Sequence, residues 1–227
     1  MPALFITSTG TEIGKTYVAC GLIRHFRRAE QPVDALKPVV SGFDATSVTA
    51  VAASDPGVLL TSLGRKPTPD EIDRISPWRF RAPLSPDLAA ARENRTIDFD
   101  ELVDFSRNAM SVHKGPLIIE GIGGLMVPLD GRRTVLDWMT MLRIPVLLVA
   151  GSYLGSISHT LTALHVLAQR RLDIAATVVN ETPNSPVTLD ETVSIIERFT
   201  GDIEVIGIPR LPSGRDHMAF GRIGRLF

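Results

Sequence analysis

Three adjacent residues near the start of the chain, Gly14, Lys15 and Thr16, are of the types that bind nucleotide phosphates. They follow an apolar run at 4–8 and open a segment whose apolar residues have helical spacing. At such a turn, backbone N–H groups cradle phosphates, the lysine reaches the outer ones and the hydroxyl ligates Mg²⁺. Thr9 stands where the G-x-x-x-x-G-K-[ST] pattern has its first glycine. A phosphate-binding loop is predicted, and the alternative is a chance Gly-Lys-Thr at a helix start.

Two further charged residues stand at the ends of apolar runs. Lys37 lies in the run 33–40, just before Pro38, which favours a strand end or edge near the sheet rim. Glu120 ends an apolar run and is followed by the glycine-rich stretch 121–124, where a ligand could approach the backbone. Its carboxylate could hold Mg²⁺ directly or through water. For Lys37 the alternative is an ordinary solvent-facing edge lysine.

The elements that must position these residues alternate between strands and helices. Apolar runs predict strands at 4–8, 33–40, 115–120, 145–150, 174–180 and 204–209. Helices are expected after residue 14, in two pieces over 45–63, at 86–92, at 98–113 and from about 157. The proline-rich segment 65–86 is interpreted as an irregular excursion on the sheet rim, and 213–227 yields no functional interpretation. The pattern predicts an α/β fold of the P-loop NTPase type, three-layered and doubly wound around a mostly parallel sheet.

In such a sheet, ligands bind along the edge formed by the carboxyl ends of the strands. The phosphate-binding loop 11–16, Lys37, Glu120 and Asn180 are all expected on that edge. Gly155 lies there too, where free N–H groups at the start of a helix would face an anion, although an ordinary strand-to-helix junction explains it as well. This convergence favours one nucleotide site.

Bulk composition limits the classes of partner. The 227 residues are enough for one α/β domain. The formal net charge of −1 gives no indication of a basic face that would bind nucleic acid. The single cysteine, Cys20, excludes an internal disulfide framework. The chain enters a strand almost at once, without a signal-peptide pattern, and has no apolar run of membrane-spanning length. A soluble cytoplasmic protein is expected, with small molecules or protein rather than nucleic acid or membrane as partners.

Taken together, the motifs resemble the dethiobiotin synthase family. The resemblance rests on six segments in the family's order: Thr11-Glu-Ile-Gly-Lys-Thr16, Lys37-Pro-Val-Val-Ser-Gly42, Phe80-Arg-Ala-Pro-Leu-Ser-Pro86, Glu120-Gly-Ile-Gly-Gly124, Leu154-Gly-Ser-Ile-Ser-His159 and Val179-Asn180. The phosphate loop is shared by many nucleotidases, whereas the segments at 37–42 and 120–124 together are specific. The resemblance implies that 1–227 is a single P-loop ATP-binding synthetase domain that uses ATP and Mg²⁺.

The resemblance also implies roles for individual residues. The residues implied in catalysis are Thr11, Lys15, Lys37 and Ser41. The residues that the resemblance implies in ATP binding are Glu12, Ile13, Gly14, Lys15, Thr16, Asn180 and Pro209. The residues that it implies as Mg²⁺ ligands are Thr16, Asp55 and Glu120. Those implied around the substrate are Ser41, Gly123, Gly155 and Ser156, the last two across a homodimer interface. Asp55 could instead be a helix cap, with Asp44 as the other candidate metal ligand, and Ser8 departs from the family's glycine.

The implied reaction is the ATP-dependent carboxylation and ring closure of 7,8-diaminopelargonate. Carbon dioxide gives a carbamate, ATP converts it to a carbamic-phosphoric anhydride, and the second amine closes the ring to yield dethiobiotin, ADP and phosphate. The alternative is a partitioning-type switch ATPase with a protein or DNA partner. The loop of those ATPases has an extra lysine near its start, where this chain has Ser8, Thr9 and Gly10. A corrinoid amidation synthetase would need a further glutaminase domain, and a nucleotide-binding domain with a different substrate remains a third possibility.

Overall fold

A computed structural model describes residues 3–211 and 217–226 of the chain. The strands are β1 (Ala3–Ser8), β2 (Asp34–Leu36), β3 (Val39–Ser41), β4 (Trp78–Phe80), β5 (Leu117–Glu120), β6 (Val146–Gly151), β7 (Ile174–Asn180) and β8 (Val205–Ile208). The helices are α1 (Lys15–Arg28), α2 (Val48–Ala53), α3 (Asp55–Ser62), α4 (Pro69–Ile75), α5 (Pro86–Arg92), α6 (Phe99–Val112), α7 (Val135–Leu142), α8 (Ser156–Gln169), α9 (Leu189–Thr200) and α10 (Ala219–Gly224).

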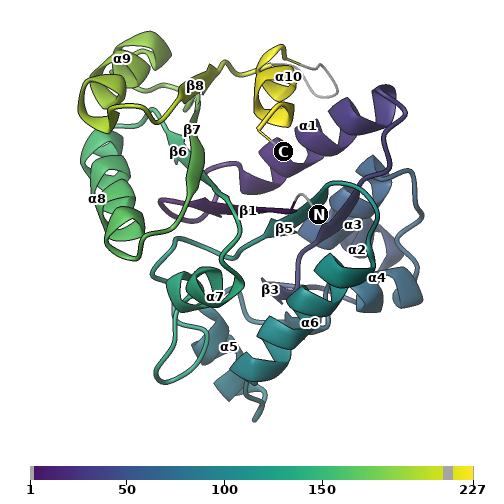
Figure 1. Cartoon of the computed structure of the whole chain (residues 1–227). Helices are drawn as coiled ribbons and strands as arrows, with labels where there is room; N and C mark the ends of the chain where they lie inside the picture. Colours follow the sequence, from purple (N-terminus) through teal and green to yellow (C-terminus); the bar gives the residue numbers. More distant parts are fainter. Residues whose placement is uncertain (1–2, 212–216, 227) are drawn as a thin grey trace.

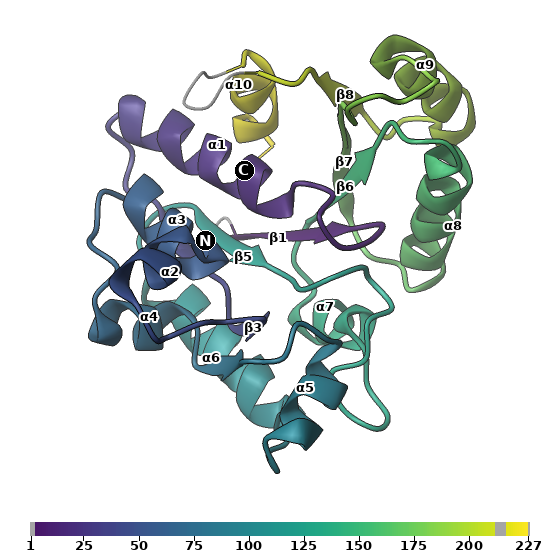
Figure 2. The same ribbon diagram turned by 180° about the vertical axis from the view of Figure 1, so that it is seen from behind.

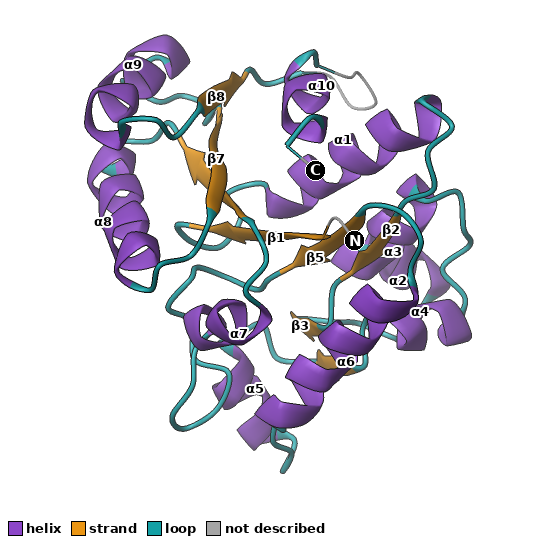
Figure 3. Ribbon diagram, viewed as in Figure 1, coloured by secondary structure: helices purple, strands orange, loops and turns teal. Residues whose placement is uncertain are grey.

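Six strands form the central sheet in the order β2-β5-β1-β6-β7-β8, and every neighbouring pair is parallel. Figures 1 and 3 show helices on both sides of this sheet, with α1 and α10 on one side and α8 and α9 on the other. The same chain seen from behind shows α10 lying against α1 (Figure 2). The expected three-layer, doubly wound α/β architecture is therefore confirmed.

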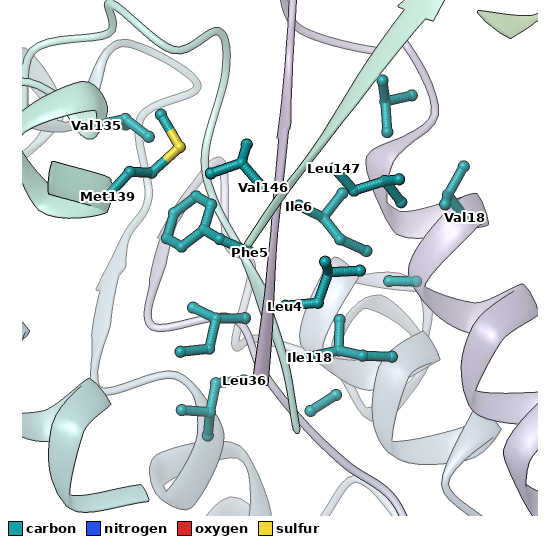
Figure 4. Packing of buried hydrophobic residues seen from close by; sticks show 14 of the residues in the cluster. Leu4, Phe5, Ile6, Val18, Leu36, Ile118, Val135, Met139, Val146 and Leu147 are labelled. Carbon is teal, nitrogen blue, oxygen red and sulfur yellow. The ribbon is translucent and has the colours of Figure 1, made fainter. Parts of the chain in front are cut away.

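The core is built on β1, all of whose residues are buried. Side chains of successive strand residues point to opposite faces. Phe5 accordingly packs toward Val135 and Met139 of α7, whereas Ile6 faces α1 at Val18 (Figure 4). On the α7 side the Trp138 ring meets Phe5 edge to face, with ring centroids 4.8 Å apart. Packing on both faces thus holds β1, and with it the loop that follows, in place.

Strand register brings the ends of distant segments together. Ile6 of β1 pairs with Glu120 of β5, and Gly151 of β6 pairs with Asn180 of β7. The phosphate-binding loop leaves β1 two residues after Ile6, at Ser8. Glu120 and Asn180 therefore both lie at the sheet edge where the loop begins, as the sequence predicts.

The prediction of one strand over 33–40 is wrong. The chain forms β2, breaks at Lys37 and Pro38, and resumes as β3, which leaves the main sheet and pairs in parallel with β4. Pro38 has no N–H to donate, and the N–H of Lys37 donates to the Ile75 carbonyl at 3.0 Å instead of to a strand. The break turns the Lys37 side chain inward.

Other expected elements need correction as well. The segment 65–86 is not irregular throughout, because it contains α4 and β4. Thr68 caps α4 and a proline occupies its first position, a helix-start signal hidden among the other prolines of the segment. Helices α7 and α9 had no predicted counterpart. The segment 213–227 is described only at 217–226, where α10 lies, and the rest of it falls outside the described residues.

Candidate active site

A cleft of about 660 Å³ opens at the carboxyl edge of the sheet beside the phosphate-binding loop. The residues predicted for the site that line it are Thr11, Glu12, Gly14, Lys15, Thr16, Lys37, Ser41, Asp55, Glu120 and Gly123. They come from the loop after β1, the break between β2 and β3, the start of α3 and the end of β5. Four separate segments thus meet around one space.

Lys37 lies at the back of this cleft with only 2% of its side chain exposed. Its ammonium Nζ lies 2.6 Å from Glu120 Oε1 and 3.3 Å from Asp55 Oδ2, and donates to the Gly121 carbonyl at 2.7 Å. The solvent-facing alternative for this lysine is therefore wrong. A buried cation is tolerated here because two carboxylates and a carbonyl surround it.

The charges in this cluster shift one another's protonation. Burial alone disfavours the ammonium of Lys37, but Glu120 and Asp55 outweigh it and raise the pKa of Lys37 above its ordinary value. Burial also opposes ionisation of Asp55, yet Lys37 and the Thr16 hydroxyl bring the pKa of Asp55 below its usual range. Lys37 and Asp55 are therefore both charged at neutral pH.

Lys15 occupies the neighbouring position and interacts with its own loop. Its Nζ donates to Ser8 Oγ at 3.1 Å and to the Gly10 carbonyl at 3.2 Å. Burial, followed by repulsion from Lys37, lowers the pKa of Lys15 to about 8. The ammonium groups of Lys15 and Lys37 thus have separate sets of partners. Lys15 binds the loop, and Lys37 binds the carboxylates.

The Thr16 hydroxyl lies between the two carboxylates, 3.0 Å from Asp55 Oδ1 and 2.8 Å from Glu120 Oε1. The second oxygen of Glu120, Oε2, is buried and has no hydrogen-bond partner in the part of the chain that the structure describes. No group of three or more His, Cys, Asp or Glu side chains that could hold a metal ion occurs among the described residues. Two carboxylates and a hydroxyl fit Mg²⁺, which commonly takes one or two carboxylates and completes its shell with phosphates and water.

The alternatives for Asp55 and Asp44 can be compared directly. Ser54, not Asp55, is the N-cap of α3, since its Oγ accepts from the Gly57 N–H at 3.3 Å. Asp55 is the first residue of the helix and points at Thr16 and Lys37. Asp44 is exposed, accepts from the Thr46 N–H and lines a different cavity. Only Asp55 lies with the other predicted metal ligands.

A second cavity, of about 470 Å³, lies on the other side of the loop. Glu12, Ile13, Gly14, Asn180 and Pro209 line it, so the loop separates the two spaces. Asn180 Nδ2 donates to the Ile13 carbonyl at 2.9 Å, and its Oδ1 is buried with no hydrogen-bond partner among the described residues. Gly14 has φ +97, and a Cβ there would lie 2.4 Å from Asn180 Nδ2. A glycine is therefore required where the loop meets Asn180.

Gly155 and Ser156 are the predicted site residues that neither cavity includes. Gly155 has φ +94 and caps α8, and Ser156 is the first helical residue. They lie at the sheet edge as expected but line neither of these two cavities.

Several lining residues have no predicted role. Pro83, Leu84, Ser85 and Pro86 form one wall of the first cleft, and Tyr17, Arg24 and Tyr153 line the second. The segment 80–86 is part of the family resemblance, which signalled its importance without a role for each residue. Tyr17 and Arg24 are hard to identify from sequence because a helix pattern does not say which exposed positions face a cavity.

The fold and the loop define a class of protein, the P-loop nucleoside triphosphatases. The chain is similar in structure to the cell division ATPase MinD of Pyrococcus furiosus, with a TM-score of 0.55 at 14% identity over 100% of this chain and 98% of that one. It is also similar to a ParA family ATPase of Chlorobium tepidum, with a TM-score of 0.52 at 16% identity over 92% and 84%. At these identities the likeness concerns the fold alone.

Sequence comparison is more specific. A family model described as AAA domain matches residues 2–216. The chain is 48% identical to the ATP-dependent dethiobiotin synthetase of Acidiphilium cryptum over 88% of this chain and 89% of that one. It is 45% identical to the enzyme of the same name from Methylobacterium nodulans, over 92% and 94%. The chain belongs to the ATP-dependent dethiobiotin synthetase family, which is a family of ligases, and the resemblance stated from the motifs is confirmed.

Among the described residues there is no helix whose length and apolar character would let it cross a membrane.

Proposed function

We propose that this protein makes dethiobiotin from 7,8-diaminopelargonate, CO₂ and ATP as a step of biotin biosynthesis, with its chemistry in the cleft around Lys37. The observation that carries the proposal is the buried cluster in which Lys37 meets Glu120 and Asp55 beside the phosphate-binding loop. Relatives at 45–48% identity named as ATP-dependent dethiobiotin synthetases support the same reaction. The cytoplasmic location and the single domain over 1–227 remain predictions.

The reaction needs no protein nucleophile. The carbamate that CO₂ forms with one amine attacks the γ-phosphorus of ATP and releases ADP. The second amine then attacks the carbamoyl carbon, expels phosphate and loses a proton as the cyclic urea closes. Both steps build negative charge on oxygen, so fixed positive charge at the reacting groups is what the protein must supply.

Lys37 and Lys15 are the ammonium groups that supply this charge in the proposal. Lys37 would lie against the carbamate together with the Ser41 hydroxyl, and Lys15 against the outer phosphates. Thr11 and Gly123, which line the cleft close to each other, would position the diamine. Such preorganised charges lower the barrier because they need not reorient during the reaction.

Thr16, Asp55 and Glu120 would hold Mg²⁺, supported by their mutual contacts and by the unpartnered Oε2 of Glu120. When bound, the metal would neutralise charge on the phosphates of ATP. In the second cavity, Asn180 and Pro209 would surround the adenine. The unpartnered Oδ1 of Asn180 is an acceptor suited to an amino group of the base.

The far carboxylate of the diamine would bind at the start of α8 in a second copy of the chain. Gly155 and Ser156 lie outside the cleft of their own subunit, which is why a homodimer is proposed. The N-terminus of a 14-residue helix attracts a carboxylate through its free N–H groups.

The test is to mix the purified protein with Mg-ATP, bicarbonate and 7,8-diaminopelargonate. We expect ADP release that requires the diamine, together with a cyclic urea identified by mass spectrometry. Lys37→Met should abolish both, whereas Lys114→Met, at an exposed lysine near the opposite end of β5, should change neither. ATP hydrolysis that is indifferent to the diamine would contradict the proposal and favour the switch ATPase.

A further inference from the structure

Ser8 ends β1 with a hydroxyl to which the proposed mechanism assigns no role. The side chain is fully buried, with 0% of the residue exposed. Its Oγ lies 2.5 Å from the Gly10 carbonyl and 3.0 Å from the Gly123 carbonyl. The Gly10 N–H approaches the same oxygen at 3.3 Å, and Lys15 Nζ at 3.1 Å. One hydroxyl thus connects the phosphate-binding loop, its lysine and the glycine-rich stretch after Glu120.

The direction of these bonds follows from counting protons. A serine hydroxyl has one proton to donate and two lone pairs to accept with. Its proton goes to a carbonyl, either that of Gly10 or that of Gly123, because carbonyls only accept. The lone pairs then accept from Lys15 and from the Gly10 N–H, since these groups only donate here. The hydroxyl therefore presents an oriented acceptor to the ammonium of Lys15.

Lys15 has a competing attraction across the cleft. Glu120 and Asp55 attract its ammonium, while Lys37, which already binds both carboxylates, repels it. Among the described residues, the Gly10 carbonyl, 3.2 Å from Lys15 Nζ, is the other acceptor on the loop side. Removing Ser8 Oγ would leave the flexible lysine with one loop contact against the pull of two carboxylates. Its stem has many rotamers, so the ammonium would no longer be confined to the loop.

We propose that Ser8 is a positioning residue, whose hydroxyl holds the Lys15 ammonium on the loop side of the cleft where the β- and γ-phosphates of a nucleotide would bind. The same oxygen lies 3.0 Å from the Gly123 carbonyl, so the glycine-rich stretch after Glu120 packs directly against this end of the loop. This role rests on the proposed nucleotide binding. It concerns an acceptor that a glycine at position 8 could not supply.

The test compares two nucleotides, of which only one can contact Lys15, so that the contribution of this lysine to binding is distinguished from that of the rest of the site. ADP has a β-phosphate for Lys15 to contact, and AMP has none. In Ser8→Ala we expect the Kd for ADP to rise about tenfold, the scale of one lost hydrogen bond to a charged group, and the Kd for AMP to change less than about twofold. The Kd for ADP is measured by calorimetry, and the Kd for AMP is measured by competition against a fluorescent adenine nucleotide.

Thr7→Val is the matched control. Thr7 is the neighbouring strand residue, 1% exposed, and its hydroxyl has no hydrogen-bond partner among the residues described. Its removal should leave both dissociation constants unchanged. The double variant Ser8→Ala/Lys15→Met should bind ADP as tightly as Lys15→Met alone, because the serine acts through the lysine. Ser8→Gly removes the same hydroxyl and serves if Ser8→Ala is insoluble.

Each outcome decides a separate question. If Ser8→Ala weakens the binding of ADP and of AMP equally, Ser8 only stabilises the loop. If the Kd for ADP is unchanged in this variant, Ser8 does not hold Lys15. Either result overturns the positioning role while nucleotide binding stands. A wild-type chain that binds no ADP would overturn the proposed function itself, and this role with it.

Discussion

At the scale of single residues, the site is dominated by one buried ammonium and the carboxylates around it. Lys37 and Glu120 are almost fully buried, whereas the Asp55 side chain is 45% exposed. A buried ion pair repays its desolvation only while both partners remain. The Lys37–Glu120 pair should therefore be costly to break from one side and much less costly to remove as a whole.

Lys37→Met should lower the free energy of unfolding by about 3–5 kcal/mol at pH 7, because the carboxylate of Glu120 is left buried without its cation. The double variant with Glu120→Gln should recover most of the stability. Urea unfolding of the wild type and both variants at pH 7 checks this, and a double variant no more stable than the single one would contradict it.

The charges of Lys37 and Asp55 in the wild-type protein define a pH window of stability. The raised pKa of Lys37 means that its stabilising contribution is complete below the unfolded value of 10.5 and is lost as pH rises through the folded value. The lowered pKa of Asp55 means that its contribution is present above 3.8 and is lost as pH falls through the folded value. The contributions of Lys37 and Asp55 are therefore both present across neutral pH.

Lys15 should make nucleotide binding depend on pH in the alkaline range. Its pKa of about 8 means that the free protein loses this ammonium as pH rises through 8, well before an ordinary lysine would. The Kd for ADP should then rise with pH above about 8, approaching tenfold per unit while bound nucleotide keeps the proton. Titrations between pH 7 and 9.5 check this. Lys15→Arg stays charged throughout, so a slope that persists in this variant would assign the effect to another group.

At the scale of elements, short helices and loop ends determine where the functional side chains point. Ser54 both ends α2, donating to the Val51 carbonyl at 2.6 Å, and caps α3, accepting from the Gly57 N–H. Asp55 follows it directly, so the cap determines the entry angle of this carboxylate into the cleft. The break at Lys37 and Pro38 does the same for Lys37 from the other side.

Ser54→Ala should cost about 1 kcal/mol of stability and raise the Mg²⁺ concentration needed for half-maximal turnover, since the start of α3 would loosen around Asp55. Ser47→Ala is the matched control. Ser47 caps α2 by accepting from the Ala50 N–H at 3.0 Å, and α2 contributes no residue to the cleft. It should cost stability without changing the Mg²⁺ requirement. Equal shifts in the two variants would remove Asp55 from the metal site.

At the scale of the whole molecule, the question is whether one subunit suffices. Gly155 and Ser156 lie at the sheet edge but outside the cleft, and in the proposed homodimer they would complete the cleft of the other subunit. If each site takes Lys37 from one subunit and the start of α8 from the other, two inactive variants that lack different parts of the site should restore activity when they form a mixed dimer. A monomeric enzyme would have no such behaviour.

Mixed dimers of Lys37→Met and Leu154→Asp test this directly. Leu154 is 76% exposed and precedes Gly155, so an aspartate there should leave the glycine and α8 in place while repelling the substrate carboxylate. Each variant alone should be inactive, and unfolding and remixing them in equal amounts should restore about a quarter of the wild-type rate, because half of the dimers carry one intact site of two. Absence of recovery, with dimers present by sedimentation, would place the carboxylate site within one chain.

The sequence by itself determined the sheet, the phosphate-binding loop and the family. Apolar runs that end in functional residues, as at Glu120 and Asn180, are local signals, and parallel strands necessarily bring their carboxyl ends to one edge. Only the tertiary structure decided that Lys37 faces inward, that Asp55 rather than Asp44 lies beside Thr16, and that Ser8 binds Lys15. The first two of these facts depend on contacts between residues far apart in the sequence, such as Lys37 with Glu120, which is 83 residues later. No local pattern encodes such a contact, because which groups meet in a buried cluster is fixed by the packing of the whole domain.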